Sequence, residues 1–94
     1  MDMTVEVGEV ATPEEFYDAF FAAAAGRVPD YGGRNLDALI DDLGDVAEPI
    51  TLTLAGADRA ADRLGDWFDR LLGSLAVATG RSSGRVSVVL RAGS

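Results

Sequence analysis

Acidic side chains are the residues of this chain whose type and spacing could do chemistry. Asp37 and Asp41 lie four residues apart, so on a helix they would share a face and repel each other by roughly 0.2–0.5 kcal/mol. Asp42 and Asp45 follow, where the helix dipole is already negative. No basic residue occurs between positions 35 and 49. Such departures from local preference predict a surface that binds a cation, and a merely soluble helix face is the alternative.

The chain lacks the residue types that most enzymes use as nucleophiles or general bases. It contains no His, no Cys and no Lys, which leaves only carboxylates, hydroxyls and Arg for catalysis. We therefore expect no enzymatic activity.

Two carboxylate patterns could hold a metal ion. The pair Asp37 and Asp41 could bind Mg²⁺, and the acidic stretch 41–48 could suggest Ca²⁺. That stretch lacks the alternating ligands and central Gly of a calcium loop, and the loop 80–85 lacks the lysine spacing of a phosphate-binding P-loop. We expect no metal and no cofactor.

The net charge indicates a cationic partner. Sixteen acidic residues face eight basic ones, which gives a formal net charge of −8. Such a field repels nucleic acid and attracts a basic protein. Acidic surfaces also confer solubility, which is the alternative that charge alone leaves open. Direct binding to nucleic acid is not expected.

Length and composition predict one small domain. A chain of 94 residues can build one hydrophobic core, so we expect a single domain over residues 1–94. The start of the chain is acidic, and no apolar run approaches the roughly 20 residues that span a bilayer, so we expect neither a signal peptide nor a membrane contact. The absence of Cys fits a reducing compartment. A cytoplasmic location is the expectation.

The elements that must position the acids begin with a strand and an aromatic helix. The strand is predicted at Thr4–Val7. Thr12 and Glu15 form a capping box around Pro13 at the first helical position, and Gly26 supplies the C-terminal stop. Between these signals, residues at helical spacing predict a face buried in the core, formed by Phe16, Tyr17, Phe20, Phe21 and Ala24.

The acidic helix is predicted from Leu36 to about Leu43, with Asn35 as its N-cap. Its apolar residues recur at i, i+3, i+4 and i+7, which predicts that one face is buried and the remaining positions face solvent. The apolar positions are Leu36, Leu39, Ile40 and Leu43.

The connector before this helix, residues 27–34, is rich in turn formers. It carries Tyr31, an amphipathic ring in a turn flanked by glycine. Tyr31 either anchors a partner or folds back onto the helix as a lid on the core, and the residues alone do not choose between these two interpretations.

The second half of the chain predicts two more strands and two more helices. The strands are Ile50–Leu54 and Val86–Leu90, and the helices run over Ala57–Leu64 and from Asp66 to about Thr79. Strands separated by helical crossovers favour parallel pairing. We therefore predict an α/β fold with a small three-stranded parallel sheet packed against about four helices.

The connector and the acidic helix together resemble the signature of the barstar family. Residues 29–43 read P-D-Y-G-G-R-N-L-D-A-L-I-D-D-L, and the family signature is P-x-Y-x-G-x-N-L-D-A-L-x-D-x-L, which forms a loop and a helix. The order of the surrounding elements also matches that family, so the resemblance implies a barstar-like fold over nearly the whole chain.

The resemblance implies an inhibitor of a small secreted, guanyl-preferring microbial ribonuclease, bound one to one and monomeric when free. Such an enzyme's cleft holds RNA phosphate with basic side chains, and a carboxylate on a rigid helix can occupy the phosphate site. By position in the signature, Asp41 is the phosphate mimic, Asp37 its flanking acid, and Tyr31 the ring that packs over the enzyme's catalytic side chains. Gly33 allows close backbone approach.

The full set of partner-binding residues that the resemblance implies covers the connector, the helix and the turn after it. It consists of Tyr31, Gly32, Gly33, Asn35, Leu36, Asp37, Ile40, Asp41, Gly44, Asp45 and Val46.

Several positions depart from the family pattern. Ile40 stands where the best-known member has Trp, Gly32 where it has a second Tyr, and Arg34 replaces an acid. The acid that the late helix of that member contributes has no clear counterpart among residues 76–79. We therefore expect the partner enzyme to be a relative of the best-known target. The alternative is a barstar-like immunity or regulatory module for a different basic toxin or nucleic-acid-binding protein.

Overall fold

Three parallel strands form one side of the molecule. The computed structural model describes residues 1–93. Within them β1 (Asp2–Glu6), β2 (Ile50–Ala55) and β3 (Val86–Arg91) pair in the order β1-β2-β3, and both pairings are parallel. The three-stranded parallel sheet expected from the sequence is confirmed.

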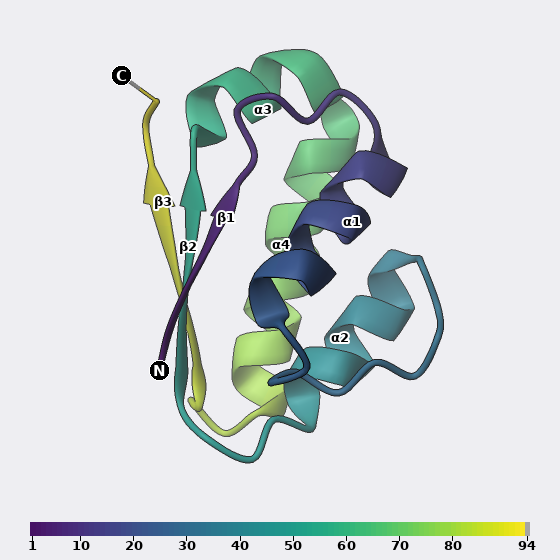
Figure 1. Ribbon diagram of the computed structural model, residues 1–94, viewed down its shortest axis with the longest axis vertical. Helices are drawn as coiled ribbons and strands as arrows, with labels where there is room; N and C mark the ends of the chain where they lie inside the picture. The colour runs from purple at the N-terminus through teal and green to yellow at the C-terminus, as the bar shows by residue number, and fades with distance from the viewer. Residues whose placement is uncertain (94) are drawn as a thin grey trace.

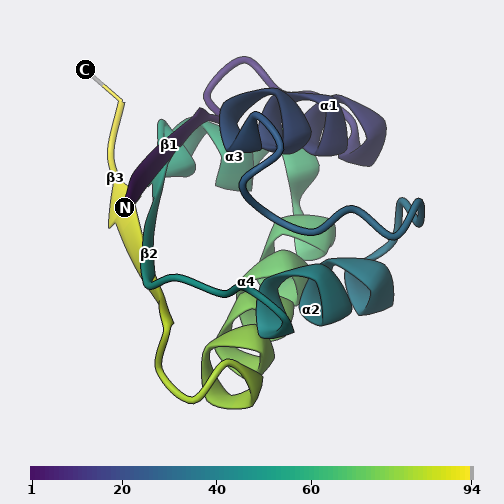
Figure 2. The ribbon, with the colours of Figure 1, turned by 60° about the horizontal axis from the view of Figure 1, so that its bottom comes forward.

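Four helices cover one face of this sheet, as Figure 1 shows. They are α1 (Pro13–Ala24), α2 (Leu36–Gly44), α3 (Ala57–Leu64) and α4 (Asp66–Arg81). In Figure 2 the sheet again stands on one side and the helices on the other. The α/β fold class predicted from the sequence is therefore correct.

The two faces of the sheet differ in polarity. The register places Met3 beside Leu52, so an apolar row crosses the sheet beneath the helices, and both side chains are buried. Thr4 lies beside Thr53 on the opposite face, which no helix covers. Most parallel sheets are buried on both faces. The polar row explains how this sheet tolerates one open face.

Aromatic side chains of α1 form the centre of the core. Phe16 and Phe20 are fully buried, and the Phe16 ring meets the Trp67 ring of α4 edge to face, with centroids 5.7 Å apart. Contacts of this kind add about 0.5–1.5 kcal/mol beyond the burial of apolar surface. The predicted aromatic face is confirmed, although Phe21 at its margin is only partly buried.

The capping box of α1 is present, and the end of the helix differs in detail from the sequence expectation. Thr12 Oγ1 accepts from the Glu15 backbone N–H at 3.2 Å, while Glu15 Oε1 accepts from the Ala11 N–H at 3.1 Å. At the other end, two residues have positive φ: Ala25 at 50° and Gly26 at 80°. The left-handed conformation therefore begins one residue before the glycine. Gly26 makes this reversal possible by continuing it without a Cβ clash.

Strand and helix boundaries shift by one or two residues from those expected, and one shift matters for the site. β1 begins and ends earlier than the predicted Thr4–Val7. α4 continues past Thr79 to Arg81, where the Ser82 N–H bonds the Ala78 carbonyl. The extra residues place Arg81 on a rigid helix instead of in a loop.

Candidate partner-binding surface

Helix α2 is positioned by its cap and by its apolar face. Asn35 Oδ1 accepts from the Ala38 N–H at 2.8 Å, which satisfies one of the free donors at the start of the helix. Leu39 and Leu43 are buried, and Leu36 and Ile40 are half-buried. The predicted cap and apolar face are both confirmed, and the opposite face of α2 is open to solvent.

Three of the four acids of this region are exposed and the fourth is not. Asp37, Asp41 and Asp45 are exposed, whereas Asp42 has 0% of its surface exposed. The expectation that Asp42 lies on the solvent face was wrong. Asp42 lies three positions after Leu39, at the margin of the buried face, and its Oδ1 accepts from the Tyr31 backbone N–H at 3.2 Å.

The buried carboxylate of Asp42 carries one unsatisfied oxygen. Within residues 1–93, its Oδ2 has no hydrogen-bond partner. Burial raises the pKa of Asp42, and the Tyr31 N–H offsets this rise only in part. The ionised form therefore costs stability in the folded state, while the bond to Tyr31 holds the connector against α2.

We expect Asp42→Asn to raise the free energy of unfolding at neutral pH by about 1 kcal/mol, because the neutral amide avoids burying a charge whose second oxygen has no partner within residues 1–93. The amide oxygen can still accept from Tyr31. Because the folded-state pKa lies above the ordinary value, wild-type stability is fully retained below the ordinary value and is lost as the pH rises through the raised pKa. Denaturant unfolding from about pH 3 to about pH 7 should show the gap between variant and wild type opening with pH.

The matched control is Asp37→Asn, which removes the same charge from the exposed face of the same helix. It should change stability by no more than about 0.5 kcal/mol, through relief of repulsion with Asp41. If the Asp42→Asn and wild-type curves run parallel across this pH range, the ionised buried carboxylate is not the cause of any stability difference.

Tyr31 is tied to α2 at two points while its ring stays in solvent. Its side chain is 63% exposed, and its hydroxyl donates to Asp45 Oδ2 at 2.8 Å. This hydrogen bond, together with the nearby acids, raises the pKa of Tyr31. With the backbone bond to Asp42, the two contacts orient the ring beside the acids. The ring is not a lid on the core, and a fixed, exposed aromatic side chain is a typical interface anchor.

The two glycines of the connector act within the protein itself. Gly32 has a φ of +94°, a conformation that side chains rarely adopt. A Cβ on Gly33 would lie 2.5 Å from the Cβ of Ala38, so only glycine lets the connector approach α2 this closely. The close approach that Gly33 allows is therefore between the connector and α2 of the same protein.

Arg34 is paired within the connector. Its guanidinium lies 3.2 Å from Asp30 and 4.2 Å from the centroid of the Phe21 ring. Hydrogen bonds from Arg34 and from the Gly32 N–H lower the pKa of Asp30. The basic residue that replaces a family acid therefore stabilises the connector through contacts with α1 and with Asp30.

Asp41 forms an ion pair that sequence reasoning missed. Arg81 Nη1 of α4 lies 2.8 Å from Asp41 Oδ1, and both side chains are 55% exposed. Gly44 lies against this pair: a Cβ there would lie 3.5 Å from the Cβ of Arg81, which is an ordinary van der Waals contact. The prediction missed this pair because it ended α4 at about Thr79, which leaves Arg81 in a loop. The observed helix is longer and brings Arg81 to α2.

The remaining positions of the expected surface separate into two environments. Gly44 is half-buried and lies beside Arg81, the partner of Asp41. Asp45 is exposed at the end of α2 and is bonded to the Tyr31 hydroxyl. Val46 is only 2% exposed and belongs to the core. The structure therefore brings together the connector and α2, and it holds the Val46 side chain beneath them.

The acids do not converge on a common point. Across residues 1–93, no three His, Cys, Asp or Glu side chains gather into a potential metal site. Within the same residues, no helix has the length and apolar character that crossing a membrane requires.

The fold and this surface define a small α/β protein that presents an acidic helix and a tethered aromatic loop on one side. Comparison with known families matches residues 1–91 to the family described as Barstar (barnase inhibitor). The chain belongs to the barstar family, whose members are inhibitors and not enzymes. No curated protein matches the chain.

Proposed function

We propose that this protein inhibits a small secreted microbial ribonuclease by filling its cationic active-site cleft with α2 and the connector before it. Family membership supports a ribonuclease-inhibitor role, and the acidic surface supports the mode of binding. The protein acts by occupancy and has no catalytic part. No cofactor or metal takes part in the proposal.

The observation that carries this proposal is the rigid presentation of Asp41. The carboxylate extends from a capped helix whose other face is packed in the core, and it is 55% exposed. A ribonuclease cleft offers Arg and Lys side chains that hold a phosphate. A carboxylate can accept charge-assisted, bidentate hydrogen bonds from such groups in place of the phosphate.

The neighbours of Asp41 extend the same chemistry. Asp37 lies one turn earlier on the same face and is exposed. The Tyr31 ring stands beside the acids with its hydroxyl already bonded to Asp45, so little conformational freedom is lost when a partner covers it. A preorganised acidic surface with one aromatic anchor suits a concave, basic partner.

The direct test is inhibition of guanyl-preferring microbial ribonucleases by the purified protein, read with a fluorogenic RNA substrate. We expect activity to fall linearly and to reach its minimum at one equivalent of inhibitor. A tight one-to-one complex of this kind also elutes as a single species larger than either protein in gel filtration.

Lack of inhibition across several such enzymes would contradict the proposal. The same surface would then serve a barstar-like immunity or regulatory module for another basic protein, because the fold alone does not determine the partner. We further propose that the free protein is a cytoplasmic monomer that leaves α2 uncovered.

Arg81 gives a second, smaller test of the surface. A partner's cation must displace Arg81 from Asp41 or share the carboxylate with it. Because an exposed ion pair is worth up to about 1 kcal/mol, we expect Arg81→Gln to tighten inhibition by up to about fivefold. The measurement is the inhibition constant at low ionic strength. Arg85→Gln removes the same charge from the residue just before β3 and is the control. Weaker inhibition by Arg81→Gln alone would instead make Arg81 a residue that positions Asp41.

A further inference from the structure

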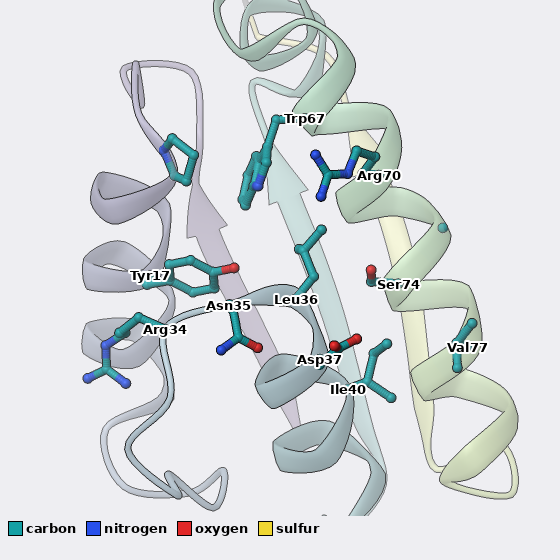
Figure 3. Close-up of a pocket in the computed structure, with 12 residues that line it drawn as sticks. Tyr17, Arg34, Asn35, Leu36, Asp37, Ile40, Trp67, Arg70, Ser74 and Val77 are labelled. Atoms are coloured by element: carbon teal, nitrogen blue, oxygen red, sulfur yellow. The ribbon is translucent and has the colours of Figure 1, made fainter.

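A groove runs beside the acidic surface, between α1, α2 and α4, and Figure 3 shows the side chains that line it. We call it the α2–α4 groove and define it by Tyr17, Leu36, Asp37, Trp67, Arg70 and Ser74. Its volume of about 570 Å³ lies within the range of ligand sites in proteins. Asp37 belongs both to this groove and to the exposed face of α2, so the groove continues the proposed interface.

The floor of the groove contains a hydroxyl group that the fold leaves without a hydrogen bond. Tyr17 is 97% buried, with 3% of its surface exposed, and its Oη has no partner within residues 1–93. In Figure 3 the hydroxyl is directed from α1 into the groove. A buried polar group without a partner costs about 1–3 kcal/mol, so its retention points to a role outside the folding of the free protein.

The wall above this hydroxyl carries a cation. Arg70 of α4 is exposed and forms no ion pair within residues 1–93, although Asp66 lies one turn before it. Its guanidinium is directed toward Trp67 and the middle of the groove in Figure 3. Its charge also acts on Tyr17, where it partly offsets the rise in pKa that burial causes. Arg70 and the unpartnered hydroxyl therefore line the same groove.

Hydrogen-bond donors dominate this end of the groove. The Arg70 guanidinium and the Tyr17 hydroxyl can both donate, while the acid Asp37 lies toward the other end, beyond Ser74 in the view of Figure 3. A group that satisfies such donors is an anion with two acceptor oxygens, and in a protein partner that group is a carboxylate.

We infer that the α2–α4 groove is a second recognition site, which takes an Asp or Glu side chain of the protein partner that α2 binds. The inference rests on the proposed function for the choice of partner. The carboxylate pairs with Arg70, and it accepts from the Tyr17 hydroxyl once the side chains that cover this buried atom move apart.

The charge pattern gives this site a role in specificity. The protein carries a formal net charge of −8, so its field attracts basic proteins without discrimination. An arginine beside the acidic helix that forms no ion pair in the described part of the chain disfavours a partner that presents a base there and favours one that presents an acid. Specificity between related partners commonly depends on such a locally opposed charge.

The site can be tested without a known partner, because Trp67 is the only tryptophan in the chain and lines the groove. The probe is sodium acetate, which models an acidic side chain, titrated against sodium chloride at equal ionic strength. We expect a saturable change in Trp67 fluorescence that acetate causes and chloride does not. The change should be lost in Arg70→Gln and weakened in Tyr17→Phe, and retained in Arg85→Gln as the matched control.

The Tyr17→Phe variant also separates binding from folding. Because the hydroxyl makes no hydrogen bond with any of residues 1–93, its removal should leave the Tm unchanged or raise it. A clear fall in the Tm would mean that the hydroxyl serves the fold, and would overturn its assignment to the site. Absence of an acetate-specific response in the wild type, or an equal response in Arg70→Gln, would overturn the site itself.

The partner is tested separately in the ribonuclease assay. We expect Arg70→Glu to weaken inhibition by about tenfold or more, since it places like charges opposite each other, and Arg85→Glu to change it little. If the wild type inhibits the ribonuclease and Arg70→Glu inhibits it equally well, the inference is overturned and the proposed function is kept. A specific acetate response without inhibition of any ribonuclease keeps the site and overturns the proposed partner.

Discussion

Replacing Asp41 with alanine is expected to weaken inhibition of the partner ribonuclease by roughly 30-fold to several thousand-fold, which corresponds to about 2–5 kcal/mol. In the complex the carboxylate would be buried against guanidinium or ammonium groups. Its removal leaves those cations desolvated and unpaired, and this penalty accounts for most of the expected loss.

The control for this experiment is Asp62→Ala. Asp62 is exposed on α3, away from α2 and the connector, and its loss changes the net charge by the same amount. We expect less than about a twofold change in the inhibition constant, because an isolated surface charge contributes little. Thermal unfolding of both variants checks that neither has lost its fold. Equal effects of the two substitutions would contradict the placement of the interface on α2.

Association of the two proteins is expected to slow by roughly 10-fold to 10³-fold between low and high ionic strength. The cause is electrostatic steering between a protein of net charge −8 and a basic cleft. Screening shortens the range of this attraction from about 30 Å at 0.01 M salt to about 3 Å at 1 M. Stopped-flow fluorescence over that range measures the association rate constant.

The dissociation rate constant supplies the internal reference for the salt experiment. Contacts inside the complex are shielded from ions, so dissociation should change far less than association over the same salt range. An association rate constant that does not respond to salt would exclude steering, and would leave the acidic surface with a role in solubility alone.

Much of the fold was predictable from local signals in the chain. The capping box at Thr12 and Glu15 and the N-cap Asn35 mark where α1 and α2 begin, because side-chain oxygens at those positions satisfy free backbone donors. Strands separated by helices predict parallel pairing through crossover handedness. These signals act within a few residues, so they can be recognised without knowledge of the packing.

Part of the candidate surface was equally predictable. The spacing of Leu39 and Leu43 defines the buried side of α2, and the exposure of Asp37 and Asp41 follows from it. The resemblance of residues 29–43 to the family signature was confirmed by the match over residues 1–91.

The connector is the first place where the tertiary structure decided the outcome. Asp42 sits at the margin between the two faces of α2, and only the path of residues 29–33 turns it into a buried acceptor for the Tyr31 N–H. The same path makes Gly33 necessary, through its contact with Ala38. The spacing of apolar residues does not predict the burial of positions between the two faces of a helix, because that burial depends on what packs against them.

By itself, then, the sequence determined the strands, the helices, the N-caps of α1 and α2, the acidic face of α2 and the family. These follow from side-chain type and spacing along one element. The tertiary structure alone decided the pairing of Asp41 with Arg81 and the placement of Tyr17 and Arg70 around one groove. Each of these joins residues 40 or more positions apart, and such contacts depend on how far a helix extends and how two helices cross. The charges that surround the proposed binding site are therefore a property of the packed structure.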